Sequence, residues 1–124
     1  MTEKDAKRLR LNTRSVDSEM GIAVGAQLHT DGYIGHARLV IEEDKHIIVG
    51  ATFIGPQVSE LLHSATVAIV SQIPIDRLWH AVPSFPTVSE VWIQLLENYD
   101  LSISQEPQEP LSYFSQDRSS SSIA

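Results

Sequence analysis

The chain has 124 residues, which is enough for one domain with its own hydrophobic core and too few for two. Its formal charge of −7 argues against nucleic-acid binding, which needs clustered lysine and arginine. Because the chain contains no cysteine, it cannot form a disulfide, a thiolate metal site or a redox dithiol of its own.

Membrane and metal partners are also not expected. The N-terminal run MTEKDAKRLRLN lacks the apolar core of a secretory signal, and no apolar run approaches the roughly eighteen residues of a membrane span. The five histidines are scattered without the spacing of zinc ligands, so no metal site is predicted. We therefore expect a cytoplasmic protein with no membrane partner and no nucleic-acid partner.

The N-terminal segment predicts a short helix followed by an extended stretch. Thr2 and Asp5 have the spacing of a capping box, which favours a polar helix over residues 3–8. An extended segment is expected near residues 11–16. The glycines between residues 21 and 35 suit turns and loops, and they lack the G-x-G-x-x-G order of a nucleotide-binding loop.

A β-hairpin is the next predicted element. Two apolar runs, residues 37–41 and 47–54, are rich in β-branched side chains and flank the polar sequence EEDK. A connection this short favours antiparallel pairing of the two strands.

A helix is predicted after the hairpin. Pro56 suits a first helical turn, and the apolar residues that follow recur at helical spacing up to the stop expected before Pro74. The residues of this apolar face are Val58, Leu61, Leu62, Ala65, Ala68 and Ile69. A short helix with Asp76 as its N-cap should follow, with Leu78 and Trp79 facing the core.

A second amphipathic helix is predicted at about residues 88–98, where apolar residues again recur on one face. Thr87 and Glu90 have capping-box spacing at its start. Residues 103–124 are rich in Ser, Gln, Glu and Pro, which predicts a disordered or loosely attached tail. The expected fold is α+β, with an antiparallel sheet built on the central hairpin and covered by two main amphipathic helices.

Two motifs in order, GATFIGPQVSELLHSATVAI and LWHAVPSFPTVSEVWIQLLE, resemble the C-terminal dimerisation domain of the FAD-dependent pyridine nucleotide-disulfide oxidoreductases. That family includes dihydrolipoamide dehydrogenase, glutathione reductase and mercuric reductase, and the likeness covers roughly residues 2–98. The resemblance implies a homodimerisation domain over residues 1–102 that lacks the family's first strand. FAD and NAD(P)H would bind upstream domains of a parent oxidoreductase active in cell redox homeostasis, and no cofactor is expected in this chain alone.

The resemblance also assigns positions in the loop before the last helix. Dithiol members of the family carry His-Pro-Thr-x-x-Glu there, and the histidine exchanges protons with the partner's active-site thiol. Pro86, Thr87 and Glu90 match this motif, whereas Phe85 occupies the histidine position. Phenylalanine has no proton to exchange, so no catalytic residue is expected in this chain. The backbone of Phe85 and Pro86 would still approach the partner's flavin in the intact enzyme.

The expected dimer is two-fold symmetric, and Trp79, His80 and Trp92 are its predicted interface residues. The alternative is a free-standing small ligand-binding protein or enzyme that reuses the fold. That function would need a pocket with converging polar groups.

Overall fold

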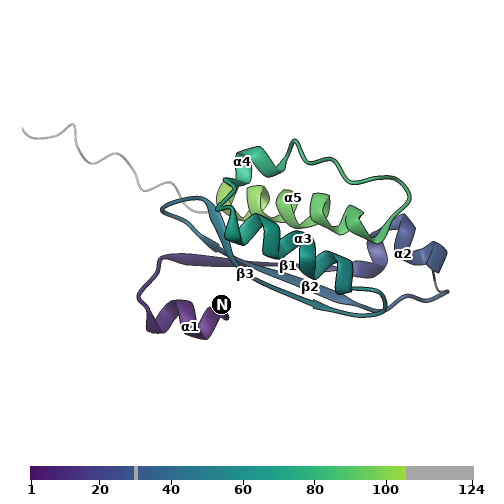
Figure 1. The fold of residues 1–124 in the computed structure, drawn as a ribbon, viewed down its shortest axis with the longest axis horizontal. Coiled ribbons are helices and arrows are strands. Elements are labelled where there is room, and N and C mark those ends of the chain that lie inside the picture. Colours follow the sequence, from purple (N-terminus) through teal and green to yellow (C-terminus); the bar gives the residue numbers. More distant parts are fainter. Residues whose placement is uncertain (30, 106–124) are drawn as a thin grey trace, which may run out of the picture.

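The computed structural model describes residues 1–29 and 31–105. In this part of the chain, antiparallel strands form one sheet in the order β1-β2-β3 (Figure 1). The strands are β1 (Thr13–Glu19), β2 (His36–Glu42) and β3 (Ile47–Ile54). The helical elements are α1 (Glu3–Arg8), η1 (Met20–Ile22), α2 (Val24–His29), α3 (Ser59–Val70), α4 (Ile75–Leu78), η2 (Val88–Glu90) and α5 (Val91–Ser104). The predicted α+β class is confirmed.

The central hairpin is confirmed. β2 and β3 pair from His36↔Ile54 to Glu42↔Ile47, with a register shift after Val40. β1 pairs with the other edge of β2, so the extended segment predicted near residues 11–16 is a strand that begins and ends later in the chain. In β2 the alternate residues Ala37, Leu39 and Ile41 belong to the core cluster, as period-two side-chain alternation requires, and Val40 and Glu42 are buried as well.

The long helices α3 and α5 cover one side of the sheet, and α1 lies on the other side (Figure 1). The largest fully buried side chains come from both layers: Met20, Leu39, Ile41, Ile48, Leu61, Val91, Leu95 and Tyr99. The capping box predicted for α1 is present, since the Asp5 N–H donates to Thr2 Oγ1 at 3.1 Å. Among the described residues, no helix combines the length and the apolarity needed to cross a bilayer.

The start and the inner face of α3 differ from the prediction. The helix begins at Ser59 with Val58 as its N-cap, and Pro56 lies in the preceding turn, where Gln57 has a φ of 57°. Leu61 is buried, but the neighbouring Leu62 is exposed, because consecutive helical residues point about 100° apart. As predicted, α3 ends before Pro74.

The N-cap predicted for α4 was wrong. Pro74 is the N-cap, with the extended φ and ψ of −61° and 146°, and the buried Ile75 begins the helix. Asp76 lies in the first turn, where its Oδ1 accepts the Arg77 N–H at 2.9 Å. Proline provides the extended conformation that an N-cap needs, so Asp76 is not required there.

The segment expected to form only turns and loops contains η1 and α2. Ala23 and Ala26 are buried in the core cluster, so tertiary packing overrides the poor helix propensity of the glycines around them. At the other end of the chain, α5 continues to Ser104, beyond the predicted end at 98 and into the first residues of the predicted tail. Residues 106–124 of that tail lie outside the described residues.

Candidate functional site

The loop between α4 and η2, residues 79–87, carries the positions that resemble the family motif. Phe85 and Val82 are 74% and 78% exposed, although both side chains are apolar. Pro86 is exposed as well. This segment, which we call the interface loop, therefore presents apolar side chains to the surroundings rather than to the core of its own domain.

The C-terminal end of the interface loop is fixed by hydrogen bonds. The predicted capping box is confirmed: the Thr87 N–H donates to Glu90 Oε2 at 3.1 Å. The Thr87 hydroxyl also donates to the carbonyl of Ser84 at 2.6 Å. Glu90 thus acts on the backbone of its own chain, as capping chemistry predicts.

A groove with a volume of about 530 Å³ lies between α3, α5 and the interface loop. Its apolar lining includes Val67, Ala68, Leu78, Val82, Trp92 and Leu96. The polar lining consists of His63 and the hydroxyl residues Ser64, Ser84, Thr87 and Ser89. None of the described residues around it is Lys, Arg, Asp or Glu, so the groove suits an apolar or neutral occupant.

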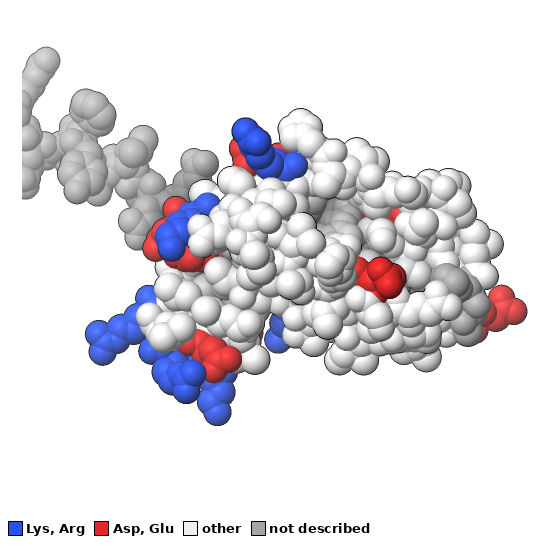
Figure 2. Space-filling view, viewed as in Figure 1, with Lys and Arg blue, Asp and Glu red and all other residues white. Residues whose placement is uncertain are grey.

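The surface around the groove is also almost free of charge. Between Leu61 and Ser89 only Asp76 and Arg77 carry a formal charge. Figure 2 shows this face mostly white over α3 and the interface loop, with a small acidic patch within it, whereas lysine and arginine side chains gather over α1. Exposed apolar side chains at this surface are Val67 and Val82, which line the groove, and Phe85 of the interface loop. We call this surface the uncharged face.

The structure does not bring the predicted interface residues together. Trp92 is half-buried, lines the groove and contacts Phe53 edge to face, with ring centroids 6.0 Å apart. Trp79 lines a separate cavity of about 450 Å³ beside Tyr99. His80 is exposed, and its backbone N–H bonds to the carbonyl of Arg77.

Sequence reasoning missed Leu62, Val67 and Val82 as surface residues. Leu62 fitted the helical spacing of the core face, and the other two were given no surface role. The long interval with almost no charge between Leu61 and Ser89 is the signal that could have located this surface.

The described residues show no catalytic constellation next to Phe85. No group of three or more His, Asp and Glu side chains among them could hold a metal ion. Burial raises the pKa of Tyr99 to about 12, so its phenol stays protonated at neutral pH. The exposed apolar side chains of this site are suited to contact with another surface.

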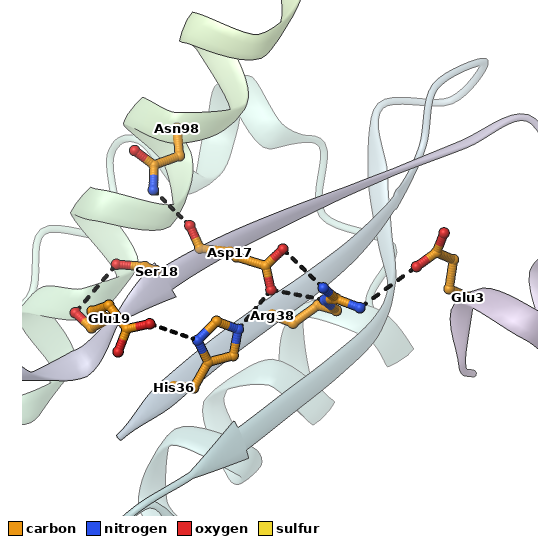
Figure 3. Close-up of polar contacts among 7 residues, drawn as sticks. All are labelled: Glu3, Asp17, Ser18, Glu19, His36, Arg38 and Asn98. Atoms are coloured by element: carbon orange, nitrogen blue, oxygen red, sulfur yellow. Dashed lines mark hydrogen bonds and ion pairs between the residues drawn. The ribbon is translucent and has the colours of Figure 1, made fainter. Parts of the chain in front are cut away.

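The charged side chains form a network on the side of the sheet where α1 lies (Figure 3). Asp17 accepts from Arg38 Nε at 2.8 Å and lies 2.7 Å from His36 Nε2. Glu19 contacts the other ring nitrogen of His36 at 3.2 Å, and Glu3 lies 3.6 Å from Arg38. The network joins α1, β1 and β2 on the surface away from the groove.

This network shifts two titrations in opposite directions. The Arg38 guanidinium, with a smaller contribution from His36, holds the pKa of Asp17 below its usual value. Hydrogen bonds that the His36 ring donates to Asp17 and then to Glu19 raise its pKa above the usual 6.5. Both pKa shifts arise because the ion pairs in the folded protein stabilise the charged forms of Asp17 and His36.

Stability should therefore fall as His36 loses its proton. The pKa of His36 is higher in the folded state than in the unfolded state, so protonated His36 stabilises the fold. This stabilisation is complete below the unfolded-state pKa near 6.5, and it is lost as the pH rises through the folded-state pKa. We expect the free energy of unfolding of the wild type to decline, relative to His36→Gln, as the pH rises above about 6.5. Urea denaturation at several pH values measures this difference. Parallel pH profiles for the two proteins would contradict it.

Comparison with known proteins identifies the fold. Residues 1–96 match the family model described as pyridine nucleotide-disulphide oxidoreductase, dimerisation domain. The chain is 30% identical over 98 residues to a dihydrolipoyl dehydrogenase of Haloferax volcanii, covering 79% of this chain and 20% of that protein. It is 33% identical over 72 residues to a dihydrolipoyl dehydrogenase of Chlamydia pneumoniae, covering 58% of this chain and 16% of that protein.

The matched segments thus span only a fifth or less of the length of these curated relatives. The family match covers most of the present chain, including the interface loop and the first turns of α5. The resemblance predicted from the two sequence motifs is confirmed. The chain therefore belongs to the dimerisation-domain family of the pyridine nucleotide-disulphide oxidoreductases.

Proposed function

We propose that this chain provides the subunit interface of a homodimeric, FAD-dependent NAD(P)H oxidoreductase, and that the uncharged face meets a second copy of itself. The observation that carries the proposal is the combination of the apolar groove with exposed apolar side chains around it. Exposed apolar surface that is depleted of charge is typical of the centre of a protein interface.

Few like charges would face each other if two copies met through the uncharged face. A two-fold interface brings identical surfaces together, so any exposed charge near the axis would meet its own copy. Asp76 and Arg77 are adjacent and of opposite sign, and the groove lining has no formal charge. Trp92 lies at the groove and is the predicted interface residue best placed to serve as an anchor.

In the parent enzyme, FAD and NAD(P)H would bind upstream domains, and the backbone of Phe85 and Pro86 would approach the partner's flavin. Exposure of both residues on the interface loop supports this contact. Phe85 carries no ionisable group, so this chain would not transfer a proton to or from a thiol of the partner. The proposed parent enzyme therefore passes electrons to an acceptor other than a dithiol.

The second candidate is a free-standing small ligand-binding protein. The volume of the groove and its hydroxyl-bearing rim favour this function, because small-molecule sites have similar dimensions. It differs from the first candidate in leaving the chain monomeric with the groove open to solvent.

Sedimentation velocity over a range of protein concentrations tests the proposed function. We expect reversible dimers whose population rises with concentration. A strictly monomeric chain at high concentration would overturn the proposal for this chain and favour the second candidate.

The role of Phe85 has a separate test in a longer protein that carries the flavin domain. Phe85→His alone is expected to leave thiol–disulfide activity near background, because the parent's acceptor site is not built for a dithiol. Steady-state assays with a disulfide substrate measure this, and Phe85→Tyr is the matched aromatic control. Appearance of disulfide reduction in the histidine variant alone would count against the proposed acceptor class.

A further inference from the structure

Glu90 connects two segments that lie far apart in the sequence. Its Oε2 accepts the Thr87 N–H at 3.1 Å and the Gly25 N–H at 3.2 Å. Gly25 is the second residue of α2, so its N–H belongs to the first turn and has no carbonyl partner within the helix. One carboxylate oxygen therefore satisfies the starts of two helical segments, α2 and the η2–α5 unit.

The backbones of the same two segments are in direct contact. A Cβ added at Gly25 would lie 2.2 Å from the carbonyl carbon of Thr87, a separation that no side chain can occupy. Glycine is therefore required at this position for α2 to approach the end of the interface loop. The close packing and the shared carboxylate act on the same two residues, Gly25 and Thr87.

We propose that Glu90 is a positioning residue for dimerisation, which fixes the interface loop to α2 so that the loop meets the second subunit in a set position. This inference rests on the proposed function, because it assigns a role within the same interface. Phe85 and Pro86 lie directly before Thr87, so the direction in which they leave the domain depends on where Thr87 is held. A preorganised loop loses less conformational entropy on association than a mobile one.

The chemistry at position 85 fits this role. The motif that this loop resembles has histidine at position 85, but Phe85 offers no imidazole N–H to the Glu90 carboxylate. Here the described hydrogen bonds of the Glu90 carboxylate go to backbone N–H groups. The side chain thus orients the loop through its main chain.

The test uses the full chain and compares Glu90→Ala, Glu90→Gln and Asn98→Ala. Alanine removes both acceptor contacts, and we expect the dimer dissociation constant to rise about tenfold, since hydrogen bonds to charged groups are among the stronger ones. Glutamine keeps one side-chain oxygen in place and should restore the constant to within about threefold of wild type. Asn98→Ala is the control, because it deletes a side-chain bond to the carbonyl of Asp17, away from the loop.

Sedimentation measures the dissociation constants, and NMR hydrogen exchange follows the Gly25 and Thr87 amides at a concentration where the chain is monomeric. We expect both amides to lose protection together in Glu90→Ala, and neither to change in Asn98→Ala even if that variant is globally less stable. An unchanged dissociation constant in Glu90→Ala with a dimeric wild type would overturn the inference. So would failure of glutamine to rescue.

A monomeric wild type would instead refute the proposed function, and the role of Glu90 in dimerisation with it. The exchange data then still decide whether Glu90 fixes the loop to α2. Retained protection of both amides in the monomeric Glu90→Ala variant would show that the loop is held by other contacts.

Discussion

Leu61→Ala is expected to lower the free energy of unfolding by about 2–5 kcal/mol, because the substitution leaves a cavity in a packed core. Leu61 lies on α3 and is 2% exposed within the core cluster that also contains Leu39 and Ile48. Urea denaturation monitored by circular dichroism measures the loss. An effect of this size would place the variant close to the limit of stability for a small domain.

The neighbouring Leu62 provides a matched control, because the same atoms are removed one position along the same helix. Leu62 is 54% exposed, so Leu62→Ala should change the free energy of unfolding by no more than about 0.5 kcal/mol when both proteins are monomeric. Comparable losses in the two variants would contradict the observed orientation of α3 and support the orientation first predicted from its sequence.

Val67→Lys is expected to raise the dissociation constant of the dimer by at least about 100-fold, because it places an unpaired charge in an apolar contact. Val67 lines the groove and is 46% exposed in the single chain, so the longer side chain has room there without disturbing the core. Sedimentation velocity measures the change. Circular dichroism should show that the monomer remains folded.

Leu101→Lys is the control for this substitution. Leu101 is 58% exposed on α5 and does not line the groove, so the same added charge should change the dissociation constant by less than about threefold. Equal weakening in both variants would indicate a general effect of surface lysine. Weakening by Leu101→Lys alone would place the interface on another surface.

The parts of the fold that sequence could predict are those decided within a few residues. The capping boxes of Thr2 with Asp5 and Thr87 with Glu90 depend only on local spacing, and both form. The hairpin followed from two apolar runs around a polar turn. Its pairing requires no knowledge of distant residues, because the short connection leaves antiparallel pairing as the natural arrangement.

The remaining features depend on contacts between distant segments. α2 was missed because Gly25 and its short length argue against a helix. It is held by contacts with a segment some sixty residues later in the chain, among them the bond from the Gly25 N–H to Glu90 of η2. Helical spacing alone placed Leu62 with Leu61, because a run of apolar residues does not show which of two neighbours points away from the core. The groove could not be predicted from the sequence either, because α3, α5 and the interface loop each contribute only part of its wall.

The segregation of charge in this molecule also affects how fast two copies can find each other. Both carry the same negative formal charge, −7, so their mean long-range force is repulsive. Apart from the adjacent Asp76 and Arg77, the proposed contact surface between Leu61 and Ser89 offers no charges that would guide an encounter. The association rate constant would therefore be that of docking without electrostatic steering, on the order of 10⁵–10⁶ M⁻¹s⁻¹, or smaller. Added salt would screen the repulsion and speed up assembly, whereas for oppositely charged partners it slows assembly.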